Sequence, residues 1–236
     1  MTCRQTPLRL FGSPDSANLV VRLALEELNL AYEFVAVDRA KREHDAPAYL
    51  QMNPQGLLPV LVDPRQDAPV FETGAILLHL VDRSGQLGPD PASPSRGRFL
   101  KWLFFTSNTL HADLRASFKP DRYMPRPDCR PAFIRALRVR IEQHFSMLER
   151  EYSASPGPYL LAADPTVIDF YIAACARWAQ LYPDGFQLKI APYSELRSMM
   201  GALEDRPAVV RACRLEHIEG APFTAPRHLD LPGITD

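Results

Sequence analysis

The sequence predicts two domains in one chain, a small α/β domain followed by a larger all-helical domain. Within residues 1–82, short apolar runs and helical stretches alternate in the order βαβ-α-ββα. Residues 83–97 are rich in Gly, Pro and Ser, which is typical of a linker. From residue 98 to 222 apolar residues recur at helical spacing, and residues 223–236 are a proline-rich tail that we expect to be irregular.

Local patterns place the elements of the first domain. Its predicted strands are 8–11, 32–37, 57–62 and 70–71, and its predicted helices are 17–28, 41–51 and 73–81. Asp15 or Ser16 can cap the first helix. Because a strand–helix–strand unit is followed by a hairpin and a closing helix, we expect a mixed four-stranded sheet. Pro59 is unusual inside a strand, where proline is normally confined to edges or starts.

The second domain is predicted to be a bundle of amphipathic helices. The predicted helices are 98–118, 132–152, 165–181, 193–204 and 207–216. The helix at 165–181 is apolar nearly all round, so we expect it to be buried. Thr166 and Asp169 have the spacing of a capping box, in which each side chain satisfies a free backbone N–H. We therefore assign them a structural role and no catalytic one.

Composition excludes several classes of protein. The net charge of −1, from 27 Lys+Arg and 28 Asp+Glu, gives no sign of the basic face of a nucleic-acid binder. The four cysteines are far apart without a CxxC, so neither a zinc site nor a disulfide framework is expected. There is no apolar run of the roughly 18 residues that a membrane helix needs, and no signal peptide is visible. We therefore expect a cytoplasmic protein without a metal.

Three segments resemble those of one family. Residues 53–59, Asn-Pro-Gln-Gly-Leu-Leu-Pro, resemble the Asn-Pro-x-Gly-x-Val-Pro signature of glutathione transferases. Residues 71–76, Phe-Glu-Thr-Gly-Ala-Ile, resemble their Glu-Ser-x-Ala-Ile segment, and Thr166-x-x-Asp169 is similar to the box that begins their central helix. The chain thus resembles the glutathione S-transferase superfamily over about residues 8–216. This resemblance implies a thioredoxin-like first domain, glutathione as co-substrate and a homodimer.

The resemblance implies a glutathione site on the first domain. With a cis bond between Leu58 and Pro59, the Leu58 backbone can pair with the cysteinyl backbone of glutathione as an added strand would; alternatively, Pro59 is a turn proline. The free N–H groups after Glu72, with the Thr73 hydroxyl, suit the γ-glutamyl carboxylate, and Glu72 suits the α-ammonium group. Alternatively, Glu72 and Thr73 are a plain N-cap pair.

The glycine end of glutathione is predicted less sharply. His44 resembles the histidine of a Gly-Glu-His segment whose basic side chain reaches the glycine carboxylate. Lys41 is a competitor for that role, and His44 could equally be a simple exposed side chain. Gln55 is a predicted glutathione contact, whereas Asn53 could equally hold its own loop.

The predicted catalytic groups lie before and within the first turn of the first helix. A thiol with a pKa of about 8.5 is mostly protonated at neutral pH, so the enzyme must supply a hydrogen-bond donor to the thiolate. This segment holds neither Tyr nor Cys, and Ala17 stands where some bacterial members carry cysteine, which argues against mixed-disulfide chemistry. We predict Ser16 as the thiolate stabiliser and Asn18 as its helper or replacement. Ser13 is a third candidate, and Ser16 as a plain N-cap is the alternative to a catalytic role.

Residues of the helix at 98–118 are predicted for the second substrate or a subunit contact. His111 resembles a histidine that faces the active site in bacterial members, and Arg115 follows one turn later. Pairing with Asp113 is an equally good structural explanation. Phe105 and Asn108 complete this prediction. Further candidate pocket aromatics are Phe104, Phe118, Tyr123 and Trp178.

The function that follows is a glutathione transferase. The expected partners are glutathione and a small hydrophobic electrophile, to which the thiolate is conjugated, or a disulfide or peroxide, which it reduces. The alternatives are a non-catalytic glutathione-transferase-like scaffold subunit and a glutathione-dependent dehalogenase or isomerase, since fold does not decide function. The sequence does not identify the electrophile.

Overall fold

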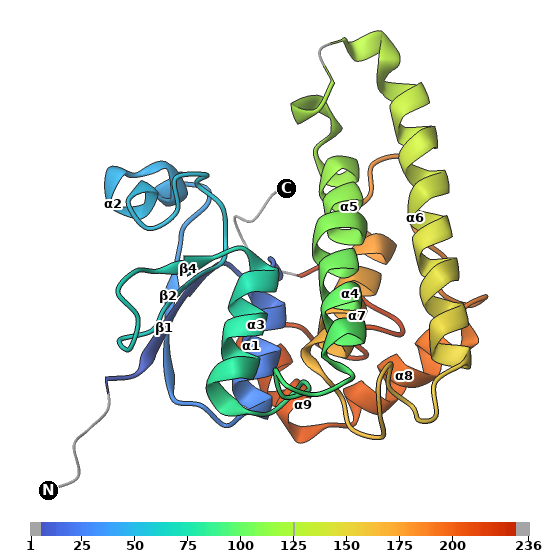
Figure 1. The fold of residues 1–236 in the computed structure, drawn as a ribbon. Coiled ribbons are helices and arrows are strands. Elements are labelled where there is room, and N and C mark those ends of the chain that lie inside the picture. Colours follow the sequence, from blue (N-terminus) through green and yellow to red (C-terminus); the bar gives the residue numbers. More distant parts are fainter. Residues whose placement is uncertain (1–5, 125, 230–236) are drawn as a thin grey trace, which may run out of the picture.

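A mixed four-stranded sheet forms the first part of the molecule. The computed structural model describes residues 6–124 and 126–229. The strands are β1 (Leu8–Gly12), β2 (Tyr32–Ala36), β3 (Val60–Val62) and β4 (Val70–Phe71). They lie in the order β2-β1-β3-β4, with β1 parallel to β2 and antiparallel to β3 (Figure 1). At the centre Phe11 is opposite Val35 on one side and Val60 on the other. The predicted mixed sheet is confirmed.

Helices cover both faces of this sheet. They are α1 (Asn18–Glu27), the 3₁₀ turn η1 (Glu43–Asp45), α2 (Pro47–Leu50) and α3 (Thr73–Ser84). Figure 1 shows α1 and α3 between the sheet and the helical part, with α2 apart from them. Leucines and valines of α1 have no exposed surface, because this helix is packed between the sheet, α7 and α9. A smaller apolar cluster, including Phe11 and Tyr49, packs under α2.

The predicted cap of the first helix is wrong. The residue that precedes α1 is Ala17, and no side chain caps the helix there. Asp15, which could have served as the cap, instead points its carboxylate into the interface with the helical part, where it meets Arg177. A buried guanidinium needs an anionic partner far more than an N-terminal N–H needs a cap, so the tertiary contact prevails.

The second part of the molecule is entirely helical. Its elements are α4 (Arg96–Phe105), η2 (Thr106–Leu110), α5 (His111–Phe118), η3 (Pro120–Arg122), η4 (Pro127–Cys129), α6 (Arg130–Ser153), α7 (Val167–Leu181), α8 (Ser194–Glu204) and α9 (Pro207–Leu215). As predicted, α7 is buried almost throughout. Among residues 6–124 and 126–229, no helix is long and apolar enough to cross a membrane.

The predicted helix at 98–118 is continuous but not regular. Its middle, η2, is a π-helical turn, and such turns are rare in helices. The start of α3 lies against this turn, and a Cβ atom on Gly74 would be 3.1 Å from the Ser107 hydroxyl oxygen. Glycine at position 74 therefore allows the two halves of the molecule to approach closely here.

A capping box begins α7, as predicted. The Thr166 N–H donates to Asp169 Oδ2 (2.7 Å), and the Ile168 N–H donates to Thr166 Oγ1 (3.3 Å). Asp169 has no exposed surface, and its other oxygen accepts from the Tyr152 hydroxyl (2.8 Å) and the Leu160 N–H (2.9 Å). Asp169 therefore joins α6, α7 and the loop between them.

Replacing Asp169 by alanine is expected to lower the free energy of unfolding by about 3 kcal/mol, because several buried donors lose their acceptor together. Urea denaturation monitored by circular dichroism measures this change. Asp164→Ala, at an exposed position on the same loop, is the matched control and should change stability by less than about 0.5 kcal/mol. Loss of activity by Asp169→Ala at an unchanged unfolding midpoint would contradict the structural assignment.

Candidate active site

The turn that precedes α1 is organised by the side chain of Asn18. The Ser13 N–H donates to Asn18 Oδ1 (2.9 Å), and the Ser16 hydroxyl donates to the same oxygen. Asn18 has no exposed surface, whereas Ser16 is partly exposed. A Cβ atom on Gly12 would be 2.4 Å from the Asn18 side chain, so glycine is required at position 12. The two predicted catalytic residues are thus in contact, with Asn18 behind Ser16.

A buried carboxylate at the end of α9 fixes the orientation of the Asn18 amide. Asn18 Nδ2 donates to Glu216 Oε1 (2.8 Å), so the amide oxygen is left to face the turn. Glu216 also pairs with Arg22 (2.6 Å) and accepts the Asp15 N–H (2.9 Å). Burial raises the pKa of Glu216, and the charge of Arg22 opposes this shift. Glu216 was not predicted from the sequence.

Asp15 ties the same turn to the helical part. Its carboxylate accepts from Arg177 Nε (2.8 Å) and Nη2 (2.7 Å), Trp178 Nε1 (3.1 Å) and the Tyr182 hydroxyl (2.5 Å). Arg177 has no exposed surface and also donates to the Pro222 carbonyl (3.1 Å). The turn that carries Ser16 is therefore held from two directions, by Glu216 and by Arg177.

The loop before β3 offers an unpaired stretch of backbone. The Leu58–Pro59 bond is cis, as the resemblance implies. Among the described residues, the Leu58 N–H and C=O have no hydrogen-bond partner. The neighbouring Leu57 carbonyl accepts from the Tyr49 hydroxyl and Asn53 Nδ2, both at 2.8 Å. Asn53 therefore holds its own loop, which was one of its two predicted roles.

Three predicted glutathione contacts lie together at the start of α3. Glu72 is exposed and has a positive φ of 71°, an uncommon conformation for a residue other than glycine. Gln55 Nε2 donates to Glu72 Oε1 (3.2 Å), which brings these two side chains into contact. Thr73 follows at the first turn of α3. A carboxylate and the free N–H groups of a helix start are thus adjacent.

The glycine-end candidates are less clearly placed. His44 is partly exposed, and its ring lies 3.8 Å from Asp45. Lys41, the competitor, pairs with Asp38 at 3.0 Å. The contact of His44 with glutathione stays a prediction.

His111 is partly buried and is held against α7 of the helical part. Its Nδ1 is 2.7 Å from the Tyr171 hydroxyl, and its ring stacks on Trp178 at 5.1 Å. Burial, with a smaller contribution from the charge of Arg115, lowers the pKa of His111 to about 4. The ring is therefore neutral at pH 7, and Nδ1 accepts the Tyr171 proton. The Tyr171 hydroxyl and His111 thus link α7 to α5.

The other predictions on this long helix have separate surroundings. Asp113 pairs with Arg140 and His144, and neither His111 nor Arg115 is its partner. Phe105 packs edge-on against Trp102 and His144, on the side of α6. Asn108 is exposed and accepts from the Ser107 hydroxyl (3.1 Å). In the described part of the chain, no hydrogen bond, ion pair or ring contact joins Phe105, Asn108 or Arg115 to the turn of Ser16.

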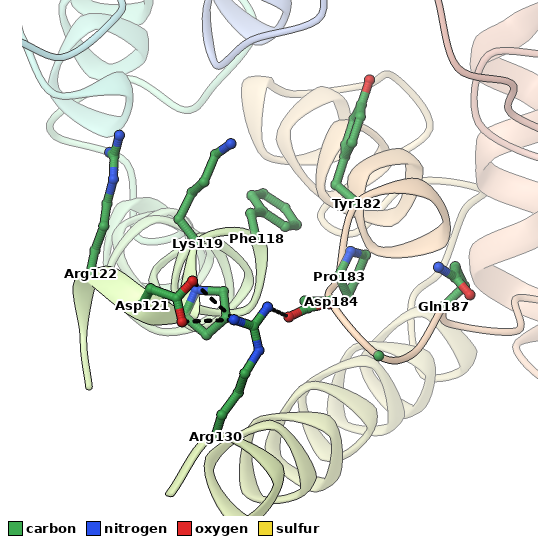
Figure 2. Close-up of a pocket in the computed structure, with 11 residues that line it drawn as sticks. Phe118, Lys119, Asp121, Arg122, Arg130, Tyr182, Pro183, Asp184 and Gln187 are labelled. Atoms are coloured by element: carbon green, nitrogen blue, oxygen red, sulfur yellow. Dashed lines mark hydrogen bonds and ion pairs between the residues drawn. The ribbon is translucent and has the colours of Figure 1, made fainter. Parts of the chain in front are cut away.

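A pocket of about 500 Å³ opens at the end of α5 (Figure 2). Its lining includes Phe118, Lys119, Arg122, Arg130 and Tyr182. Phe118 was among the predicted pocket aromatics, whereas Trp178 is buried against His111. Across residues 6–124 and 126–229, no cluster of His, Cys, Asp or Glu could hold a metal ion.

Comparison with known proteins decides the family. A model described as the glutathione S-transferase N-terminal domain matches residues 6–82, and one described as the C-terminal domain matches residues 131–211. Glutathione S-transferase 3 of Zea mays is 32% identical over 209 residues, covering 87% of this chain and 84% of that protein. The chain belongs to the glutathione S-transferase family.

Other relatives of this glutathione S-transferase span most of its length. Disulfide-bond oxidoreductase YfcG of Escherichia coli is 25% identical over 208 residues, covering 86% of this chain and 93% of that protein. The crystal structure of glutathione transferase URE2P6 from Phanerochaete chrysosporium with oxidized glutathione has a TM-score of 0.75 at 26% identity, covering 92% of this chain and 98% of that one. The predicted fold, a thioredoxin-like domain followed by a helical domain, is confirmed.

Several residues that organise the site escaped the sequence analysis. Arg177 had a usable signal, because an arginine in a helix that is apolar nearly all round requires a buried acceptor. Asp15 was considered only as a cap, although it was the acidic residue beside the predicted Ser16. Glu216 had no signal, since a single carboxylate at the end of an amphipathic helix is usually solvated.

Proposed function

We propose that this glutathione S-transferase binds glutathione along the Leu58–Pro59 backbone and at the start of α3. The main observation in support is the unpaired Leu58 backbone beside Glu72 and Thr73. An extended peptide can pair with Leu58 as an added strand. Its γ-glutamyl group then meets a carboxylate for its ammonium and free N–H groups for its own carboxylate. Gln55, hydrogen-bonded to Glu72, completes this end of the site.

Ser16 then stabilises the glutathione thiolate. Its hydroxyl has one hydrogen, which it donates to Asn18 in the absence of a ligand. When the sulfur of glutathione binds, the Ser16 hydroxyl rotates and donates its hydrogen to the sulfur instead. Asn18 Oδ1 still accepts the hydrogen bond from the Ser13 N–H. Asn18 is thus a positioning residue, and the start of α1 adds the favourable potential of a helix N-terminus. The thiolate attacks an electrophilic carbon and displaces a leaving group or adds to a double bond.

Reduction of disulfides is the second candidate reaction. It is favoured by the relative named a disulfide-bond oxidoreductase, which is similar to this chain over 86% of its length. Both reactions begin with the same thiolate and differ in whether it attacks carbon or sulfur. The homodimer and the contact from His44 stay predictions of the resemblance, and the cytoplasmic location stays a prediction from the sequence.

Calorimetry with glutathione tests the site. We expect wild-type binding in the micromolar to millimolar range and at least about tenfold weaker binding by Glu72→Ala, because a charge-assisted contact to the ammonium group is lost. Glu33→Ala on the edge strand β2 removes an exposed glutamate elsewhere on the same domain and should leave the Kd unchanged. Absence of wild-type binding would overturn the proposal in favour of a scaffold subunit.

A further inference from the structure

The pocket at the end of α5, here called the cationic pocket, is lined by residues from three segments. These are Phe118–Arg122, Arg130 at the start of α6, and 182–187 after α7. Figure 2 shows the side chains of Lys119, Arg122 and Tyr182 pointing to the same side of the pocket. Arg130 lies deeper in this view, with its guanidinium between two carboxylates.

Of the three cations that line the cationic pocket, Arg130 has carboxylate partners among the described residues, whereas Lys119 and Arg122 do not. Arg130 binds Asp121 at 2.7 and 2.9 Å and also pairs with Asp184, so both carboxylates of the lining serve one cation. Within the described residues, Lys119 and Arg122 have no carboxylate within 4 Å. Two cations therefore remain to attract an anion that enters the pocket.

The walls beside these cations are aromatic. The rings of Phe118 and Tyr182 are 6.0 Å apart and nearly perpendicular, at 74°. On another side Tyr182 meets His228 edge-on at 5.2 Å, and its hydroxyl is bound to Asp15. Tyr182 is thus fixed in place, and its half-buried ring lines the pocket beside that of Phe118.

The pocket adjoins the turn where the thiolate would form. Tyr182 binds Asp15, and Asp15 directly precedes Ser16 in the chain. The cationic pocket, whose lining residues all belong to the helical part, is therefore joined to the Ser16 turn through Tyr182.

We propose that the cationic pocket selects, as second substrate, an aromatic electrophile that carries a carboxylate or another anionic group. The ring lies against Phe118 and Tyr182, and the anion meets Lys119 and Arg122. This inference rests on the proposed function, because it names the substrate class of the same site. The prediction from the sequence was a small hydrophobic electrophile, to which this inference adds an anionic group.

An activated aryl chloride is a suitable probe. The glutathione thiolate forms the carbon–sulfur bond at the ring carbon, the carbon–chlorine bond breaks, and chloride leaves with the bonding electrons. The thiol proton passes to solvent. A matched pair of probes is 4-chloro-3-nitrobenzoate and 4-chloro-3-nitrobenzamide, which differ in charge and hardly in shape.

The experiment compares kcat/KM for the two probes, each divided by its rate with free glutathione. We expect the wild type to favour the benzoate by about tenfold at low salt, with a smaller ratio at high salt. In the double variant Lys119→Gln/Arg122→Gln, the normalised kcat/KM values for the benzoate and the benzamide should differ by less than about twofold. Arg150→Gln/Arg197→Gln removes two exposed cations of α6 and α8, at the far end of the helical part, and should keep the wild-type ratio.

Binding measurements separate this inference from the proposed function. The double variant should keep the wild-type Kd for glutathione and lose affinity for the unreactive 3-nitrobenzoate. Wild-type glutathione binding without a preference for the benzoate would overturn the cationic pocket and leave the proposed function intact. A weakened glutathione Kd in the double variant would also overturn it, by assigning both cations to glutathione. Absence of wild-type glutathione binding would count against the proposed function.

Discussion

Replacing Ser16 by alanine is expected to lower kcat/KM at neutral pH about 100-fold, the usual size for one donor to a developing anion. The pKa of the thiol of bound glutathione should rise toward about 8.5, its value without a stabilising donor. The physical reason is that, within residues 6–124 and 126–229, Ser16 has the one side-chain hydroxyl that is hydrogen-bonded to Asn18 at the start of α1. The pH dependence of kcat/KM and thiolate absorbance of the bound glutathione measure both changes.

Ser13→Ala is the matched control for Ser16→Ala. Ser13 lies in the same turn and is buried, but its contact with Asn18 is through the backbone N–H, which alanine keeps. We expect near wild-type activity from this variant. A large loss with Ser13→Ala and none with Ser16→Ala would transfer the role to Ser13.

Replacing Asp15 by alanine is expected to lower the free energy of unfolding by about 4 kcal/mol, because the partner charge stays buried and unpaired. Arg177, which has no exposed surface, loses its bidentate carboxylate and keeps only carbonyl acceptors. Trp178 Nε1 and the Tyr182 hydroxyl lose an acceptor as well. Chemical denaturation of the whole chain measures the change.

Two further variants keep this prediction testable if Asp15→Ala does not fold. Tyr182→Phe removes one of the donors to Asp15 and should cost about 1 kcal/mol. Asp121→Ala removes an exposed partner of Arg130, which keeps Asp184, and should cost less than about 1 kcal/mol. Equal losses from Asp15→Ala and Asp121→Ala would contradict the assignment of Asp15 as a buried interdomain anchor.

Periodicity and turn residues were sufficient to predict the fold. The helix predicted at 207–216 is α9 at Pro207–Leu215, and the one at 165–181 is α7 at Val167–Leu181. The capping box of Thr166 and Asp169 was also predicted correctly, because both partners are three residues apart and depend on local geometry alone. Local rules succeed where the partners are near in sequence.

Contacts between distant segments were beyond those rules. The turn of Ser16 is fixed by Glu216 and Arg177. Both residues are far from the turn in the sequence, and no spacing or motif connects them with it. The same holds for the π-helical turn in the middle of the long helix, which meets α3 at Gly74. The predicted roles of Phe105 and Asn108 depend on which face of that helix is turned to the site, and helical spacing alone does not decide this.

The anchoring of the Ser16 turn also has a consequence for the order in which the protein assembles. Asp15 contacts Arg177, which is 162 residues later in the chain, and Glu216, which is 201 residues later. During synthesis from the N-terminus, the sheet can form while these partners are still untranslated. Contacts of such large sequence separation form late because closing the intervening chain is entropically costly. The Ser16 turn is therefore completed only when the last helix has docked, so a nascent chain that already contains the whole first domain still lacks the contacts that order this turn.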